Sequence, residues 1–119
     1  MTVKQKEKLL NRFIKSKANE HGLTDWRFYY CDSNRKDFSY AHCIIGLKMI
    51  FIENDSIRDY SIETLQDIVL HEFAHAIAGK KAMHGKEFRK VCKQIGCKGN
   101  RASDNYECYE LRGKFPWQL

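Results

Sequence analysis

The sequence predicts a single α+β domain in which one helix precedes a small three-stranded sheet and two further helices follow it. The chain has 119 residues, enough for one domain with its own core and too few for two of ordinary size. Apolar and aromatic runs typical of strands fall within residues 26–53, and helical spacing of apolar residues occupies segments on both sides. The last 23 residues, 97–119, show no strong period and are expected to form an irregular tail of the same domain, residues 1–119.

The first helix is expected over residues 2–22. Thr2 can cap its start, because a hydroxyl can accept a hydrogen bond from a free backbone N–H of the first turn. Gly22 can end it. Between these two residues, apolar side chains recur at helical spacing: Leu10, Phe13 and Ile14.

Three strands are expected over residues 26–31, 38–46 and 48–53. Residues 32–37 form a turn cluster, and residues 54–60, "NDSIRDY", are expected to be a loop because they are rich in turn-forming residues. The aromatic residues of the first strand are expected to fill the core between sheet and helices: Trp26, Phe28, Tyr29 and Tyr30.

Two helices follow the sheet. The first is expected over residues 62–78, with Ser61 as its N-cap and Gly79 just past its end. Its apolar stripe consists of Ile62, Leu65, Val69, Phe73 and Ala76. After a connector the last helix is expected over residues 85–96, with Gly96 at its end. Its apolar face consists of Phe88, Val91, Cys92 and Ile95.

The composition is that of a globular protein, with 43% apolar and 30% charged residues. No apolar run is long enough to span a bilayer, and the N-terminus lacks the pattern of a signal peptide, so we expect a cytoplasmic monomer, or a nuclear one in a eukaryote. The five cysteines include no C-x-x-C pair and are expected to be free thiols. The alternative is a second metal site formed by Cys92, Cys97 and Cys108.

The net charge of +6 is unevenly distributed. Residues 1–79 hold 11 basic and 11 acidic residues, whereas residues 80–119 hold 10 basic and 4 acidic ones. Such asymmetry favours a polyanionic partner, most often nucleic acid, although a solvated basic surface explains it equally well. The cations expected to face solvent and to contact DNA without sequence specificity, single strands included, are Lys86, Arg89, Lys90 and Lys93.

The stretch "VLHEFAHAIAGKKAMHGKEF", residues 69–88, carries the most specific signal. His71 and His75 stand four apart in the expected helix, so their imidazoles lie on one face and can bind the same metal ion. Glu72 follows His71 and can reach a water on that metal without being a ligand. The pattern predicts a zinc site in which Glu72 acts as general base.

A catalytic zinc ion takes three protein ligands and keeps one position open. His84 follows the helix after the turn at Gly79 and is the expected third ligand, so the predicted cofactor is one Zn²⁺ per chain. Two other interpretations remain: a surface histidine pair on an amphipathic helix, and a metal site without catalytic function.

The segment "HEFAHAIAG…HGKEFRKVCKQIGC" resembles the SprT-like zinc metalloprotease family, which includes Spartan. In that family a histidine–glycine pair opens the helix after the H-E-x-x-H helix, and an aromatic residue lies three positions after the glycine. Here these are His84, Gly85 and Phe88, and the resemblance covers most of residues 5–100. It implies a minimal zincin fold, peptide hydrolysis, and DNA-linked proteins as one class of substrate.

The resemblance also implies the roles of the site residues: His71, His75 and His84 bind zinc, and Glu72 is the catalytic base. Many relatives continue into a zinc ribbon with paired cysteines, whereas this chain has only Cys108 in that region, so a ribbon is absent or vestigial. The sequence does not identify an oxyanion-stabilising residue; the candidates are His42, Tyr106 and Tyr109.

The expected function is therefore that of a zinc-dependent endopeptidase whose substrate is a protein or peptide. The alternative is a DNA-associated binding protein in which zinc only ties the two last helices together. Aromatic residues lie among the basic residues of the tail: Tyr106, Tyr109, Phe115 and Trp117. They suit either base stacking on single-stranded nucleic acid or packing over the sheet.

Overall fold

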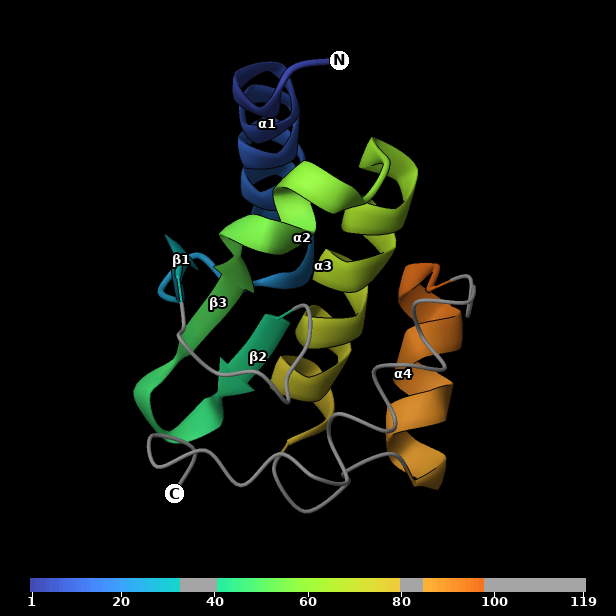
Figure 1. Cartoon of the computed structure of the whole chain (residues 1–119). Helices are drawn as coiled ribbons and strands as arrows, with labels where there is room; N and C mark the ends of the chain where they lie inside the picture. Colours follow the sequence, from blue (N-terminus) through green and yellow to red (C-terminus); the bar gives the residue numbers. More distant parts are fainter. Residues whose placement is uncertain (33–40, 80–84, 98–119) are drawn as a thin grey trace.

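A computed structural model confirms the α+β class (Figure 1). The structure describes residues 1–32, 41–79 and 85–97, with His42 described by its backbone alone. The elements are α1 (Val3–His21), β1 (Arg27–Cys31), β2 (Ala41–Ile44), the short 3-10 helix η1 (Ile45–Leu47), β3 (Met49–Glu53), α2 (Asn54–Asp59), α3 (Ile62–Ala78) and α4 (Lys86–Ile95). The expected tail lies outside the described residues.

The predicted ends of α1 are confirmed. The hydroxyl of Thr2 accepts a hydrogen bond from the backbone N–H of Gln5, and the Gln5 side chain accepts one from the backbone N–H of Thr2. This reciprocal pair satisfies two N–H groups that the helix itself cannot pair. At the other end Gly22 adopts a φ of 72°, a left-handed conformation that glycine reaches without steric cost.

The three strands form a mixed sheet in the order β1-β3-β2. β1 runs parallel to β3, and β2 runs antiparallel to it. The last strand in the sequence is thus the central one, and the two earlier strands form the edges of the described sheet. The sequence predicted three strands but not this order, because strand propensity does not determine which strands pair.

One face of the sheet packs against α1 and α3 and forms the main core. The rings of Phe28 on β1 and Phe73 on α3 lie 5.4 Å apart. The fully buried side chains at the centre of this core are Leu10, Ile50, Ile52, Ile57, Leu65, Ile68, Val69 and Phe73. Three of the four aromatic residues expected in the core pack against this cluster: Trp26, Phe28 and Tyr30.

Tyr29 corrects the expectation for the fourth aromatic residue. Its exposed fraction is 39%, and its ring stacks on that of Phe51 at a centroid distance of 5.4 Å. Successive residues of a strand point to opposite faces, so Tyr29 cannot share the core face with Phe28 and Tyr30. Tyr29 and Phe51 lie on the sheet face opposite α1 and α3.

The second strand, expected over residues 38–46, ends two residues earlier than predicted. β2 ends at Ile44, and residues 45–47 form η1, in which Lys48 at the C-cap has a φ of 54°. Ile45 and Gly46 therefore belong to the turn that brings β3 back antiparallel to β2. Residues 38–40 of the expected strand lie outside the described residues.

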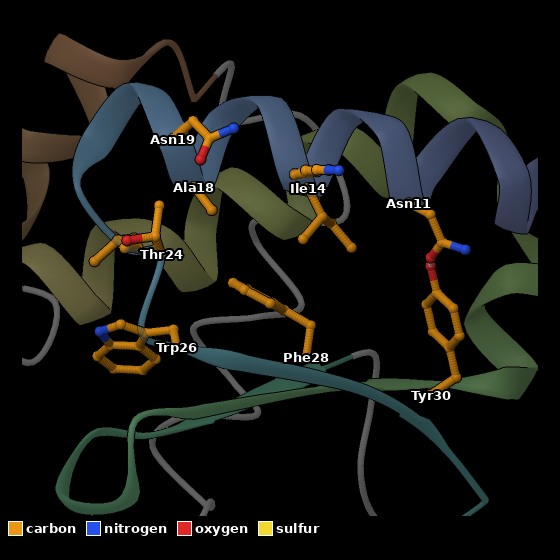
Figure 2. A pocket seen from close by; sticks show the side chains of 10 residues that line it. Asn11, Ile14, Ala18, Asn19, Thr24, Trp26, Phe28 and Tyr30 are labelled. Atoms are coloured by element: carbon orange, nitrogen blue, oxygen red, sulfur yellow. Dashed lines mark hydrogen bonds between the residues drawn. The ribbon is translucent and has the colours of Figure 1, made fainter.

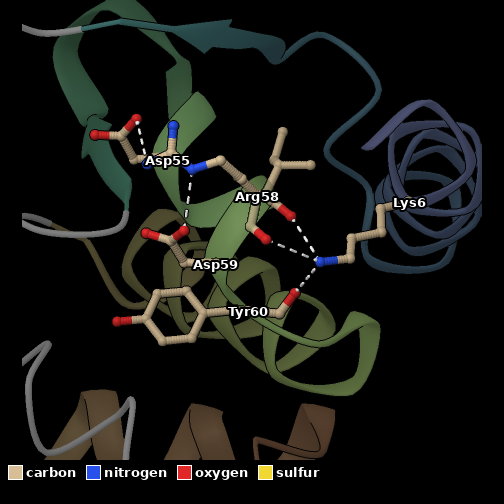
Figure 3. A network of polar contacts seen from close by, with 6 residues as sticks. Lys6, Asp55, Arg58, Asp59 and Tyr60 are labelled. Carbon is tan, nitrogen blue, oxygen red and sulfur yellow. Dashed lines mark hydrogen bonds and ion pairs between the residues drawn. The ribbon is translucent and has the colours of Figure 1, made fainter. Parts of the chain in front are cut away.

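Residues 54–59, expected as part of a loop, form the helix α2. Six residues are too few for helical spacing to be recognised in a sequence, and a tertiary contact helps to stabilise this helix. The Lys6 side chain of α1 donates hydrogen bonds to the backbone oxygens of Ile57, Arg58 and Tyr60, at 3.0, 3.2 and 2.8 Å (Figure 3). These carbonyls lie at the end of the helix, where they lack partners within it.

The helix α3 spans the predicted residues 62–78, and its N-cap Ser61 accepts a hydrogen bond from the backbone N–H of Thr64. It packs against α1, α2, β2 and α4 and is buried along most of its length. Figure 1 shows α1 and α4 on opposite sides of α3. None of the described helices combines the length and apolar character needed to cross a membrane.

Candidate metal centre

His71 and His75 lie one turn apart on α3, and their ring centroids are 4.9 Å apart with an angle of 77° between the ring planes. The helix accounts for this proximity, since side chains four residues apart share one face. Two imidazoles this close together can supply two nitrogen ligands to one metal ion. Glu72 stands beside them in the same turn of α3.

All three side chains are buried. The exposed fraction is 4% for His71, 1% for Glu72 and 7% for His75. This contradicts the interpretation of a surface histidine pair on an amphipathic helix. Buried ionisable groups are costly unless they have a partner or a function, so the burial favours a site in which these groups are used.

The α4 helix covers the two histidines through Phe88. The centroid of the Phe88 ring lies 5.0 Å from that of His71 and 4.3 Å from that of His75. Phe88 is 5% exposed, and the predicted apolar face of α4 is confirmed by its packing against α3. The periodicity of α4 predicted that Phe88 is buried, but the sequence did not indicate that its ring contacts both imidazoles.

The third expected ligand, His84, lies outside the described residues. Within the part of the chain that the structure describes, no group of three His, Cys, Asp or Glu side chains is placed to hold a metal ion. The described residues thus contribute two imidazoles and one carboxylate. Their chemistry fits two of the three protein ligands of a zinc site and its general base.

Gly79 marks the point where the chain leaves α3. Its φ is 92°, a backbone conformation that side chains other than glycine rarely adopt, and its N–H donates to the His75 carbonyl at 3.0 Å. The helix therefore ends one turn after His75. The chain returns at Gly85 to begin α4, whose Phe88 lies against the histidines.

The four cations expected to face solvent on α4 do so. Lys86, Arg89, Lys90 and Lys93 are all exposed, and the buried residues of this helix are Phe88 and Val91. The helix thus separates an apolar face against the histidines from a basic face. No ion pair of these four cations is present among the described residues.

The four described cysteines are free thiols, as expected. Cys92 and Cys97 meet at the end of α4, where the backbone N–H of Cys97 donates to the Cys92 carbonyl at 2.9 Å. A hydrogen bond with the Cys92 thiol, burial and the nearby carboxylate of Asp67 all raise the pKa of Cys97 above its usual range. Cys108, the third member of the alternative metal site, lies outside the described residues.

A second half-buried thiol, that of Cys31, lies at the end of β1. The Cys31 thiol donates to the Glu53 carboxylate at 3.3 Å, and Glu53 is 3% exposed. Burial, together with the charge of Glu53, raises the pKa of Cys31 to about 12. The sequence does not reveal this pair, because 22 positions separate the two residues and only the parallel pairing of β1 with β3 brings them together.

The remaining histidines lie outside the cluster on α3. His21 ends α1, half-buried, with its Nε2 3.5 Å from a carboxylate oxygen of Glu20. His42 pairs with Phe51 in the sheet register, as expected for a strand residue. The other two oxyanion candidates, Tyr106 and Tyr109, lie outside the described residues, as do the aromatic residues near the C-terminus: Phe115 and Trp117.

A buried pair of imidazoles and a buried carboxylate on the central helix of an α+β domain characterise a protein with a candidate metal centre. The model of the SprT-like family matches residues 6–108, and the chain belongs to this family. The match extends from α1 through α4 and includes His84. It confirms the resemblance seen in the sequence. No curated protein matches the chain.

Proposed function

We propose that this protein is a zinc-dependent endopeptidase with a minimal zincin fold. The observation that carries the proposal is the buried cluster on α3: two imidazoles 4.9 Å apart with Glu72 in the same turn. Membership of the SprT-like family is consistent with this function. The zinc ligands are His71, His75 and His84, and the general base is Glu72.

Zinc, when bound, polarises the scissile carbonyl and lowers the pKa of water from 15.7 to about 7. Glu72 accepts the proton of the attacking water and passes it to the leaving amine. Its 1% exposure supports this role, because a buried carboxylate holds and releases a proton without competition from bulk water. Phe88 fixes the orientation of His71 and His75 by contact with both rings.

The substrate lies extended along β2, where it adds a strand to the sheet. β2 is an edge of the described sheet, and it packs directly against α3. A peptide paired with this edge passes close to the helix that carries the histidines. Main-chain hydrogen bonds hold such a peptide largely irrespective of its side chains.

The decisive experiment compares the native protein with Glu72→Gln in a casein-cleavage and autocleavage assay, with and without DNA. The amide is similar in size but cannot accept the proton of water, so cleavage is lost while zinc and fold are retained. Glu63→Gln is the matched control, because it makes the same change at an exposed position of the same helix. Cleavage by Glu72→Gln at the native rate, with zinc still bound, would show that Glu72 is not the base.

The second candidate function is a DNA-associated binding protein in which zinc ties α3 to α4. The packing of Phe88 against both histidines favours it, because the two helices already meet at the proposed site. A structural zinc needs no buried carboxylate beside its ligands, so this function predicts equal behaviour of native protein and Glu72→Gln. In either function we propose DNA as a partner of the basic face of α4.

A further inference from the structure

We propose that α1 and β1 form a binding surface for single-stranded nucleic acid, separate from the basic face of α4. The surface consists of a row of cations on α1, named here the α1 stripe, and of the groove between α1 and β1. The α1 stripe comprises Lys4, Lys8, Arg12 and Lys15. The proposal does not depend on peptide hydrolysis, and the two can fail independently.

The α1 stripe is a consequence of helical spacing. Its four positions follow steps of four, four and three residues, so they fall within an arc of about 80° and rise along the axis by about 6 Å, 6 Å and 4.5 Å. All four side chains are exposed, and none forms an ion pair in the described part of the chain. The other two lysines of the helix are engaged elsewhere, Lys6 on α2 and Lys17 with Glu20.

The positive charge of α1 does not appear in the net charge of residues 1–79, which is zero. Acidic residues in the rest of residues 1–79 balance it, yet α1 alone carries six basic and two acidic residues. Of the acidic residues outside α1, Asp25, Asp55 and Asp59 pair with Lys48 and Arg58. Of the two on α1, Glu20 pairs with Lys17, and Glu7 lies near Tyr30 at one end of the groove. A row of unpaired cations at regular spacing suits the phosphates of an extended strand.

The groove beside the α1 stripe has a volume of about 310 Å³ (Figure 2). One wall comes from α1, where Asn11, Lys15 and Asn19 stand at the rim. The other wall carries the aromatic side chains of Trp26, Phe28 and Tyr30. Lys15 belongs both to the α1 stripe and to the groove, so a strand that follows the cations passes along the groove.

The groove offers the contacts that unpaired bases use. Bases stack on aromatic rings, and side-chain amides can hydrogen-bond to base edges. Half-buried Trp26 provides an anchored ring for stacking, because it packs against the core on its inner side. Asn19 is exposed at the rim and makes no side-chain hydrogen bond within the described residues.

A membrane surface fits α1 less well. A basic helix that binds lipid inserts its apolar face between the headgroups. The apolar face of α1 is occupied, since Leu10, Ile14 and Ala18 are at most 6% exposed within the protein core. An acidic peptide would satisfy the cations but would leave the aromatic wall of the groove without a partner.

The test measures the intrinsic fluorescence of Trp26, which lines the groove. In a Trp117→Phe background Trp26 is the sole tryptophan, so its fluorescence reports contact with a base. We expect oligo(dT) to quench this fluorescence at low salt. A Lys4/Lys8/Arg12/Lys15→Gln variant should lose the quenching, and its slope of log affinity against log salt should be shallower by about 3, at about 0.7 per phosphate contact.

The comparison variant is Lys86/Arg89/Lys90/Lys93→Gln, which loses the same net charge at the other proposed DNA surface, on the far side of α3. It is expected to lower the total affinity for oligo(dT), but to leave the quenching of Trp26 at saturating oligo(dT) in place, because Trp26 lies on the α1 side. Retained quenching of Trp26 in the comparison variant supports the proposal. If both variants lose the quenching of Trp26 equally, the effect is one of net charge alone and the proposal is overturned. The proposal is also overturned if the α1 variant keeps both the quenching and the salt slope of the native protein. Binding of poly-glutamate or anionic vesicles as tight as that of oligo(dT) would also overturn it. Circular dichroism melting confirms that both variants are folded.

Discussion

The ring of Phe88 on α4 lies 4.3 Å from the ring of His75 on α3, with a tilt of 30° between them. The two positions are thirteen apart in the chain, and the packing of α4 against α3 brings their rings together. This contact joins the last described helix to the proposed zinc ligands. It makes the geometry of the site depend on the packing of α4.

Phe88→Ala is expected to lower the free energy of unfolding by about 3–5 kcal/mol, because it removes a buried ring and leaves a cavity. It should also weaken zinc binding, since the imidazoles lose the surface that orients them. Urea unfolding without metal and titration with zinc measure the two effects separately. Val91→Ala is the matched control, a neighbouring buried residue of the same cluster. Native zinc affinity in Phe88→Ala would exclude an orienting role.

Removing any proposed zinc ligand should abolish stoichiometric binding, because two protein ligands hold zinc much more weakly than three. Elemental analysis is expected to find one zinc per native chain and far less in His71→Ala, His75→Ala and His84→Ala. His21→Ala, a histidine away from the cluster, should keep the metal. Full occupancy in His84→Ala would remove that residue from the site.

Reversal of charge on the basic face of α4 should lower the affinity for DNA. It should also make that affinity less sensitive to salt concentration. A variant with Lys86, Arg89, Lys90 and Lys93 changed to Glu loses the phosphate contacts and adds repulsion. Fluorescence anisotropy with single- and double-stranded oligonucleotides at two salt concentrations measures the effect. Equal binding by native protein and variant would leave a DNA-independent peptidase as the better description.

Lys6→Met should destabilise the protein by about 1.5–3 kcal/mol, the usual range for hydrogen bonds that involve a charged group. Methionine keeps the aliphatic stem but cannot donate to the three carbonyls at the end of α2. Lys8→Met, two positions along the same helix at an exposed site, should be nearly neutral. Equal stability of the two variants by urea unfolding would mean that the Lys6 contacts contribute nothing.

The pKa of about 12 for Cys31 predicts a loss of stability at alkaline pH. The folded pKa lies above the unfolded value, so the stabilisation is complete below pH ~8.5 and disappears as pH rises through the folded pKa. Urea unfolding at pH 7.5 and 10.5 should show this decrease, and Cys31→Ala should reduce it. Part of the decrease should remain, because burial likewise raises the pKa of Tyr30 to about 12. An unchanged pH dependence in Cys31→Ala would rule out the thiol as its source.

Local patterns in the sequence determined the long elements and the spacing of the candidate site. Caps at Thr2 and Ser61 and glycines at 22 and 79 marked the ends of α1 and α3, because cap chemistry acts within one turn of the chain. The separation of four between His71 and His75 was enough to place both imidazoles on one face. The apolar spacing of α4 likewise predicted which of its residues are buried and which are exposed.

Tertiary structure decided the features that depend on residues far apart in the chain. Strand order placed β3 in the centre and brought Cys31 to Glu53. The cation of Lys6, more than fifty positions away, caps α2, a helix too short to be recognised by its own sequence. Alternation within β1 is local, but only the packing of helices on one face of the sheet decided that Tyr29, and not its neighbours, is the exposed residue. The contact of Phe88 with both histidines arises only when α4 packs on α3, and the burial of Glu72 arises only when other elements cover α3, since a pattern within one helix does not specify what covers it.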